Sequence, residues 1–232
     1  MGKPKLLDMF CGVGGASVGY DRAGFDVIGV DIAPQPNYPF FFVQMDAIEM
    51  LLTSFTKFEA FHASPPCQAH SALGKGTNDN SDDYPDFLEA TRAVLAMTGK
   101  PYVIENVAGA PLNNPITLCG EMFGLAVIRH RMFESNILLM QPEHIKHRGR
   151  VAGWRHGEKF DGPYFAVYGN GGGKGNLDEW REAMGMPWAQ TKLEIAEAIP
   201  PAYTEYIGGQ LIDALDYIGD TPAQPRLDTA CR

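Results

Sequence analysis

Short apolar runs that alternate with glycine turns and helical patterns constrain the fold of this chain more than any other feature. Runs rich in β-branched and aromatic residues occupy positions 5–10, 26–31, 41–46, 58–64 and 101–106. Apolar residues recur at spacings of three or four across 85–97 and again across 203–218, which predicts a helix in each range. The stretch 118–134 is typical of a turn followed by a strand pair that carries Arg129 and Arg131. Strands that alternate with helices favour an α/β fold, with a mostly parallel sheet covered on both faces.

Polar residues follow most of these predicted strands. Parallel strands present their carboxyl ends at one edge of a sheet, where such folds bind ligands. Any one of the acids alone is typical of an ordinary turn. Together they predict one polar site at that edge, built from Asp8, Asp31, Asp46, Glu105 and Cys67.

The segment DMFCGVGG at 8–15 is a glycine-rich turn directly after the first predicted strand. It lacks the GK[ST] of a phosphate-binding P-loop and the GxGxxG of a dinucleotide site. Asp8 would repel a pyrophosphate but suits a ligand that carries an ammonium group and a ribose. Asp31 is placed to accept ribose hydroxyls, and Asp46 to accept from an adenine amino group. These features favour S-adenosylmethionine over NAD.

The charge pattern sets limits on binding partners. A formal net charge of -9 is unusual for a protein that contacts phosphates, which need Lys and Arg. The stretch 144–159, HIKHRGRVAGWRHGEK, is basic, and it is either a solvated loop or a phosphate-facing arm. His144 and His147 could ligate a metal, but no cysteine or acid stands at ligand spacing, so we expect no metal site.

Cysteine usage and the start of the chain indicate the cellular compartment. The four cysteines are widely spaced without a CxxC pair, so we expect reduced thiols rather than a disulfide framework. No apolar run approaches the length of a membrane span, and the first residues do not form a signal peptide. We therefore expect a cytoplasmic protein.

Several motifs, in order, resemble those of the DNA cytosine-C5 methyltransferases. The resemblance extends from residue 6 to about residue 215, nearly the whole chain. It rests on LLDMFCGVGGASVGYDRAGF (6–25), SPPCQAHS (64–71), IENV (104–107), RHRMFE (129–134), REAMGMPW (181–188) and AIPPAYTEYIG (198–208). Compact versions of this kind resemble phage or prophage enzymes.

The resemblance implies a three-layer, Rossmann-like fold of S-adenosylmethionine-dependent methyltransferases, with a much reduced target-recognition segment. The implied organisation is a catalytic and cofactor-binding core at 1–134, a recognition segment at 135–177, a C-terminal part of the core at 178–220 and a flexible tail at 221–232. The recognition segment contains the basic stretch and a glycine-rich run at 168–176.

The resemblance also implies the roles of individual residues. Cys67 would add to cytosine C6, Glu105 would hold the N3 edge and donate a proton there, and Arg129 and Arg131 would position the base. The implied cofactor residues are Asp8, Phe10, Gly12, Gly14, Asp31, Ile32, Asp46 and Pro66. The implied base-contacting and loop residues are Pro65, Gln68, Ser71 and Asn106. The loop at 69–83 would close over a flipped cytosine.

Two departures from the family pattern affect these expectations. Val127 stands where a Gln precedes the two arginines, and Ala196-Glu197 replaces a Gly-Asn pair that contacts the cofactor. We expect a monomer that acts on double-stranded DNA in a bacterial cell or a phage-infected host, away from membranes. The alternatives are the same chemistry on RNA, a non-catalytic DNA- or cofactor-binding protein, and a methyltransferase for small molecules.

Overall fold

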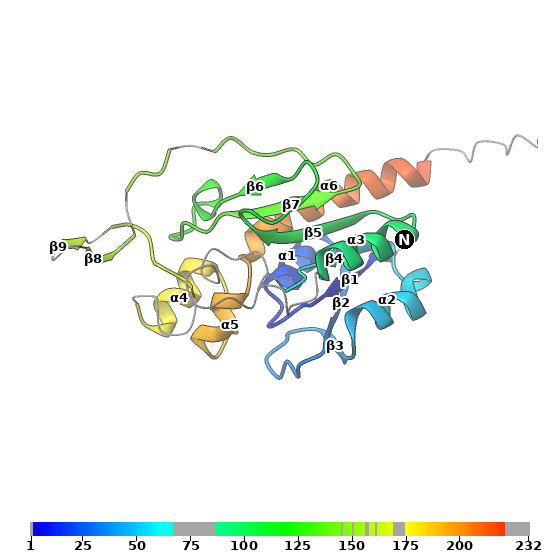
Figure 1. Cartoon of the computed structure of the whole chain (residues 1–232), viewed down its shortest axis with the longest axis horizontal. Helices are drawn as coiled ribbons and strands as arrows, with labels where there is room; N and C mark the ends of the chain where they lie inside the picture. The colour runs from blue at the N-terminus through cyan, green and yellow to red at the C-terminus, as the bar shows by residue number, and fades with distance from the viewer. Residues whose placement is uncertain are drawn as a thin grey trace, which may run out of the picture.

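A computed structural model describes residues 2–66, 87–144, 146–149, 151–155, 158–160, 162–168 and 175–220 of the chain. The predicted site residues Cys67, Gln68 and Ser71, the predicted closing loop, most of the glycine-rich run and the tail at 221–232 lie outside these residues. Within the described part, a mixed sheet carries helices on both faces, and a smaller helical lobe lies beside it (Figure 1).

The sheet is built from the strands expected at the start of the chain and a further pair. The main strands are β1 (Lys5–Met9), β2 (Asp26–Asp31), β3 (Phe41–Gln44), β4 (Ala60–Ala63), β5 (Tyr102–Val107), β6 (Ile116–Leu118) and β7 (Arg131–Ser135). The helices are α1 (Gly15–Ala23), α2 (Ala47–Ser54), α3 (Phe87–Met97), α4 (Leu177–Met184), α5 (Lys192–Glu197) and α6 (Pro201–Asp220), with short 3-10 helices η1 (Phe55–Lys57) and η4 (Gly120–Phe123).

The strand order across the described sheet is β3-β2-β1-β4-β5-β7-β6. Strands β1 to β5 pair in parallel, and β7 runs antiparallel to both of its neighbours, β5 and β6. The predicted α/β fold with a mostly parallel sheet is therefore confirmed. Because β1 is central, its carboxyl end lies between the ends of β2 and β4, where a ligand site is expected.

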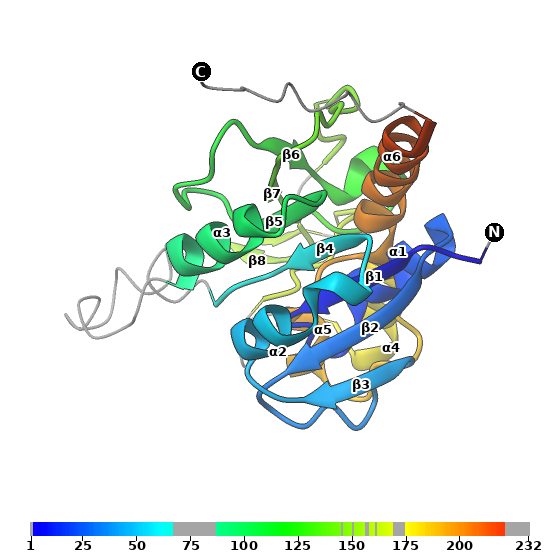
Figure 2. The same ribbon diagram turned by 90° about the vertical axis from the view of Figure 1, so that its right-hand side faces the viewer.

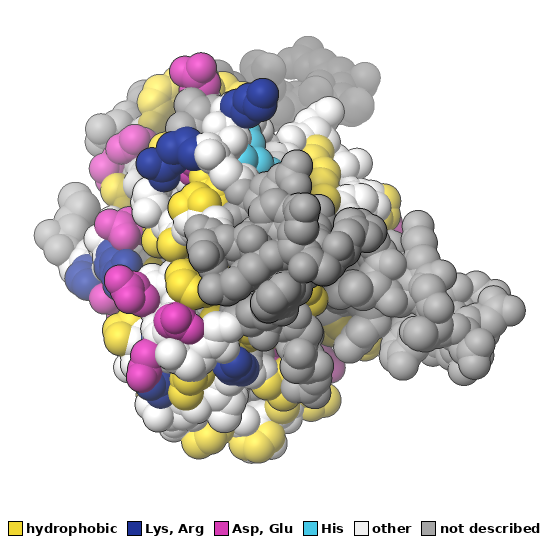
Figure 3. Space-filling view, turned by 90° about the vertical axis from the view of Figure 1, so that its left-hand side faces the viewer, with side chains coloured by type: hydrophobic (Ala, Val, Ile, Leu, Met, Phe, Trp, Pro, Cys, Tyr) yellow, Lys and Arg dark blue, Asp and Glu magenta, His cyan; other side chains and the backbone are white. Residues whose placement is uncertain are grey.

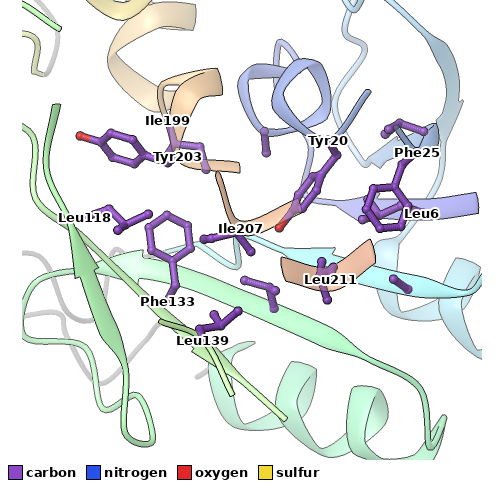
Figure 4. Packing of buried hydrophobic residues seen from close by; sticks show 14 residues of the cluster. Leu6, Tyr20, Phe25, Leu118, Phe133, Leu139, Ile199, Tyr203, Ile207 and Leu211 are labelled. Carbon is purple, nitrogen blue, oxygen red and sulfur yellow. The ribbon is translucent and has the colours of Figure 1, made fainter. Parts of the chain in front are cut away.

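Two apolar clusters join the helices to the two faces of the sheet. Helices α1 and α6 pack together on one face, and α2 and α3 cover the other (Figure 2). Figure 4 shows the first cluster, where Tyr20 of α1 and Ile207 and Leu211 of α6 meet side chains of the strands. The predicted C-terminal helix is thus confirmed, and its apolar stripe explains why the end of the chain returns to the first strand.

The strand pair predicted across 118–134 forms with different boundaries. β6 ends at Leu118, η4 follows, and β7 begins only at Arg131, so Arg129 precedes the strand instead of lying in it. The chain approaches itself so closely here that a Cβ on Gly120 would lie 2.2 Å from the carbonyl oxygen of Val127. Gly124, with φ of 71°, ends η4 in the left-handed region that favours glycine.

A third apolar cluster forms the smaller lobe around α4 and α5. Trp180 and Met184 of α4 and Ile195 of α5 pack there with Val13 of the glycine-rich turn. The hairpin of β8 (Gly153–Arg155) and β9 (Glu158–Phe160) lies at the left edge of Figure 1. None of the helices in the described ranges combines the length and apolar character required to cross a membrane.

Candidate active site

A cavity of about 470 Å³ opens at the carboxyl ends of the parallel strands. Asp8 of β1, Asp31 of β2 and Glu105 of β5 all line it. These strands are either neighbours or separated only by β4, so their registers carry the three acids to the same edge. The structure thus brings together three of the four acids predicted to meet there.

The glycine-rich turn forms one wall of this cavity, through Phe10, Gly12 and Gly15 among others. Phe10 and Gly12 have φ of 59° and 48°, in the left-handed region. Gly14 has φ of 86°, and a Cβ there would lie 2.9 Å from the side chain of Tyr38. The turn therefore holds its backbone against the cavity in a shape that needs glycine. Gly14 supports the turn without lining the cavity itself.

Asp31 joins this turn to the end of β2. One carboxylate oxygen accepts a hydrogen bond from the backbone N–H of Gly12 at 3.0 Å. The other oxygen accepts from the N–H of Ala33 at 2.9 Å. Ile32, which is 72% exposed, also lines the cavity, as the resemblance implied. These contacts fix the Asp31 carboxylate at the cavity wall, with lone pairs left for a ligand hydroxyl.

Asp8 is fully buried at the bottom of the turn. Its Oδ2 accepts a hydrogen bond from the Ser17 hydroxyl, which also lies 2.7 Å from the Tyr38 hydroxyl. Its Oδ1 has no hydrogen-bond partner among the described residues. Burial raises the pKa of Asp8 to about 7, and the charge of Asp31 adds to this rise. A cationic ligand in the cavity would stabilise the charged form of Asp8.

Asp46 lies elsewhere. Its Oδ1 accepts a hydrogen bond from the backbone N–H of Glu49 at 2.9 Å and so caps the N-terminus of α2. The residue is exposed and is not among those that line the cavity. Its predicted contact with an adenine amino group therefore stays a prediction.

The chain that leads to Cys67 enters the cavity at Pro65 and Pro66, which both line it. The side-chain amide of Asn106 donates a hydrogen bond to the carbonyl oxygen of Pro65 at 3.2 Å. The Asn106 side-chain oxygen accepts from the N–H of Val107 at 2.9 Å. Asn106 therefore ties the end of β5 to the segment after β4, and its role in fixing the loop stays a prediction.

Glu105 and Arg131 form a largely buried ion pair inside the cavity, with 3.0 Å between Glu105 Oε1 and Arg131 Nε. Burial raises the pKa of Glu105, while the charges of Arg131 and Arg129 and a hydrogen bond from Ser64 oppose the rise. Arg131 also donates from Nη1 to the carbonyl oxygen of His130 at 2.9 Å. The pair therefore places a carboxyl group with a raised pKa next to the guanidinium of Arg131.

Arg129 is buried and contacts backbone carbonyls. Its Nη1 donates to the carbonyl oxygen of Val167 at 2.8 Å, and its Nη2 donates to that of Ala196 at 2.6 Å. Its own carbonyl oxygen accepts from the Tyr203 hydroxyl at 2.6 Å. Arg129 does not line the cavity, so its contacts are those of a residue that joins the sheet to the smaller lobe.

Two further groups of residues lie near the site, and of these only the pair Ala196-Glu197 was noted from the sequence. Ile199 and the pair Ala196-Glu197 line the cavity from the other side of the turn, and burial together with the charge of Asp31 raises the pKa of Glu197. Behind Ser64, the buried His62 lies 3.0 Å from the Ser64 hydroxyl and 2.9 Å from the Tyr20 hydroxyl. Burial lowers the pKa of His62 to about 3, so this imidazole stays neutral.

The sheet order, its reversed strand and the position of the cavity define an α/β fold of the methyltransferase class. Solved structures support this at low identity. The Schizosaccharomyces pombe Dnmt2 methyltransferase superposes with a TM-score of 0.62 and 15% identity, over 92% of this chain and 100% of that chain. The Entamoeba histolytica methyltransferase EhMeth superposes with a TM-score of 0.62 and 12% identity, over 93% and 99% of the two chains.

Comparison of the sequence with family models and with known proteins shows what the chain is similar to. Residues 4–114 match the model of the C-5 cytosine-specific DNA methylase family. The type II methyltransferase M.FnuDI of Fusobacterium nucleatum is 31% identical over 114 residues, which cover 45% of this chain and 33% of that protein. M1.HphI of Haemophilus parahaemolyticus is 33% identical over 118 residues, covering 44% and 32%. This similarity to the DNA cytosine-5-methyltransferase family covers about the N-terminal half of the chain. The matched region spans about a third of the length of these relatives.

Proposed function

We propose that this protein is a DNA cytosine-C5 methyltransferase that uses S-adenosylmethionine and forms a covalent bond between Cys67 and cytosine C6. The observation that carries the proposal is the arrangement of one cavity with two chemically different ends. The glycine-rich turn with Asp8 and Asp31 forms one end, and the Glu105–Arg131 pair beside Pro65 forms the other.

The first end fits the proposed cofactor. The unpartnered Oδ1 of buried Asp8 suits an ammonium group, and Asp31 offers lone pairs to two ribose hydroxyls. Phe10 and Ile32 supply apolar surface for a flat ring. When bound, S-adenosylmethionine supplies an electrophilic methyl group. Asp8, Asp31 and Phe10 would hold the cofactor at this end of the cavity.

The second end fits activation of a cytosine ring. In the proposed reaction, the Cys67 thiolate forms a bond to C6, and the ring electrons move toward N3. Glu105, whose pKa is raised by burial, donates its proton to N3. Arg131 remains charged and stabilises the negative charge that develops on the ring. C5 would then take the methyl group, with S-adenosylhomocysteine as the leaving group. Water would accept the C5 proton as the C6–S bond breaks and restores the thiolate, and N3 would return its proton to Glu105.

The target strand is proposed to approach through the segment at 135–177. A cytosine inside a duplex cannot reach the cavity, so the base must leave the stack, at a cost of a few kcal/mol. The recognition segment and the closing loop at 69–83 are proposed to perform this step. We also propose that the enzyme is a monomer, that it acts on double-stranded DNA and that it works in the cytoplasm.

Transfer of a tritiated methyl group from S-adenosylmethionine to duplex DNA and to transfer RNA tests the proposal. We expect label in DNA, and bisulfite sequencing of DNA from cells that express the protein then gives the methylated sites. The Cys67→Ala variant should bind the cofactor normally and transfer no label.

Three outcomes would contradict the proposal. Label in RNA but none in DNA would move the same chemistry to another substrate. Binding of S-adenosylmethionine without transfer to either polymer would indicate a non-catalytic member of the family. Retention of activity in Cys67→Ala would exclude the covalent mechanism.

A further inference from the structure

Four potential metal ligands meet at the end of the β6–β7 pair. They are the thiol of Cys119 and the imidazoles of His130, His144 and His147, and one ligand atom of each lies within 4.8 Å of every other. We propose that this cluster is a structural zinc site. The expectation of no metal rested on the absence of a cysteine or acid at ligand spacing. In the folded chain, Cys119 is that partner, although it lies far from His144 and His147 in the sequence.

The sheet itself brings the first two ligands together. β6 and β7 pair antiparallel, with Leu118 opposite Arg131 as the last pair. Cys119 follows directly after β6 and His130 directly precedes β7, so the two residues face each other where the pairing ends. Cys119 is fully buried and forms no disulfide within the described part of the chain, so its sulfur can act as a ligand.

The other two ligands come from the segment after β7. The Nε2 atoms of His130 and His144 lie 3.1 Å apart. Two nitrogen ligands of one tetrahedral zinc ion are separated by about 3.4 Å, given Zn–N bonds of about 2.0–2.1 Å. The three imidazole rings have centroid separations of 5.0, 5.2 and 5.4 Å. The cluster is therefore close to the size that a bound zinc ion requires.

An outer carboxylate completes the pattern of a zinc site. The buried Glu121 accepts from His147 Nδ1 at 2.8 Å, so the Nε2 of His147 faces away from this contact and is free to bind a metal. Zinc-binding histidines usually donate their second nitrogen to a carboxylate or carbonyl in this way. The Cys119 thiolate would offset part of the charge of Zn²⁺, and Glu121, which also pairs with Arg148 at 2.6 Å, lies in the outer shell.

The ligand set favours zinc in a structural role. Thiolate and imidazole ligands suit zinc, whereas magnesium and calcium prefer oxygen ligands. Four protein ligands fill a tetrahedral ion and leave no open position for a water molecule or substrate. On the face seen in Figure 3, a histidine side chain lies beside Lys or Arg side chains.

The site would connect two parts of the protein that matter for the proposed function. His144 and His147 belong to the segment proposed to recognise the target, while His130 precedes the strand that carries Arg131. The His130 carbonyl oxygen accepts from Arg131, which in turn pairs with Glu105. Zinc would thus hold the start of the recognition segment to the strand that positions the catalytic pair.

Metal analysis of the purified protein tests the inference independently of activity. We expect one zinc per chain in the unmodified protein and in Cys11→Ser, a control that changes a buried cysteine outside the cluster. Cys119→Ser and His144→Ala should lose the metal. His144 is exposed, so its removal should leave the fold intact even where Cys119→Ser does not fold.

Zinc titration of the chelator-treated protein provides the second measurement. Zn²⁺ should raise the Tm of the unmodified protein but leave that of His144→Ala unchanged. Co²⁺ should give a thiolate charge-transfer band that disappears in Cys119→Ser. Glu121→Gln should weaken zinc binding about 10–100-fold.

The inference would be overturned if the unmodified protein bound no zinc, or if Cys119→Ser and His144→Ala bound it as tightly as the unmodified chain. Failure of methyl transfer alone, with zinc bound as expected, would contradict the proposed function and leave the zinc site standing.

Discussion

Asp8 shows how a single residue can reduce the stability of the fold and still serve the site. It is fully buried, one of its oxygens has no hydrogen-bond partner among the described residues, and it lies near Asp31, so its charged form is unfavourable in the protein alone. In the unfolded chain, it ionises at its ordinary pKa of 3.8, while in the fold it keeps its proton up to about pH 7. The stabilisation from protonated Asp8 is therefore complete below about pH 4 and is lost as pH rises to about 7.

Asp8→Asn should remove this pH dependence. Without cofactor, the variant should be more stable than the unmodified protein above pH 7, by up to about 4 kcal/mol. Its affinity for S-adenosylmethionine should fall by about 10-fold or more, because a charged hydrogen bond is lost. Urea unfolding between pH 4 and 8, with calorimetric titration of the cofactor, measures both effects. A variant that is less stable at pH 8 and binds the cofactor normally would contradict this account.

Glu105 provides a second prediction at the same scale. Glu105→Gln keeps the shape of the side chain but cannot donate a proton to N3, so methyl transfer should fall at least about 100-fold. Cofactor affinity should change little, since the Glu105–Arg131 pair lies at the other end of the cavity. Single-turnover transfer and cofactor titration separate these two effects. Full activity in the variant would remove Glu105 from the proposed mechanism.

At the scale of elements, the contact between α1 and α6 depends on glycine. A Cβ on Gly208 would lie 2.5 Å from the Cβ of Ala23, and a Cβ on Gly19 would lie 2.1 Å from the carbonyl oxygen of Pro201. A Cβ on the neighbouring Gly209 would meet no atom of another described segment within 4 Å. Helix α1 therefore packs closely against the face of α6 that carries Gly208 and not against the position of Gly209.

Adjacent substitutions in α6 should have opposite effects. Gly208→Ala should destabilise the protein by about 1–3 kcal/mol, because the added methyl group pushes the helices apart. Gly209→Ala should stabilise it by up to about 1 kcal/mol through improved helix propensity. Thermal unfolding of the two variants provides the comparison, with each acting as the control for the other. Equal effects would show that the close approach of α1 and α6 contributes little.

At the scale of the whole molecule, Arg129 joins the sheet to the smaller lobe. Its side chain bonds the carbonyl oxygens of Val167 and Ala196, which come from two distant parts of the chain. The Trp188 indole N–H adds a bond to the carbonyl oxygen of Val13 at 2.9 Å. These buried hydrogen bonds therefore hold the lobe against one side of the cavity.

Arg129→Ala should lower the free energy of unfolding by about 2–4 kcal/mol, since two buried carbonyl groups lose a charged donor. Arg22→Ala is the matched control, because Arg22 forms only an exposed ion pair with Glu205 at 3.6 Å and should cost about 1 kcal/mol or less. Denaturant unfolding of both variants measures the difference. Equal losses in the two variants would argue against Arg129 as the link between sheet and lobe.

The sequence by itself determined the parallel strands, the helix at the C-terminus and the acids at the strand ends, because each depends on local periodicity and on residues next to a turn. The ordered motifs indicated the family for the same reason. Only the tertiary structure decided which acids share the cavity: Asp46 turns to cap α2, while Asp8 and Asp31 line the cavity. It also showed that Arg129 faces backbone carbonyls and that Cys119 meets three histidines. These outcomes depend on strand pairing and packing between residues far apart in the chain, which spacing along the sequence does not record.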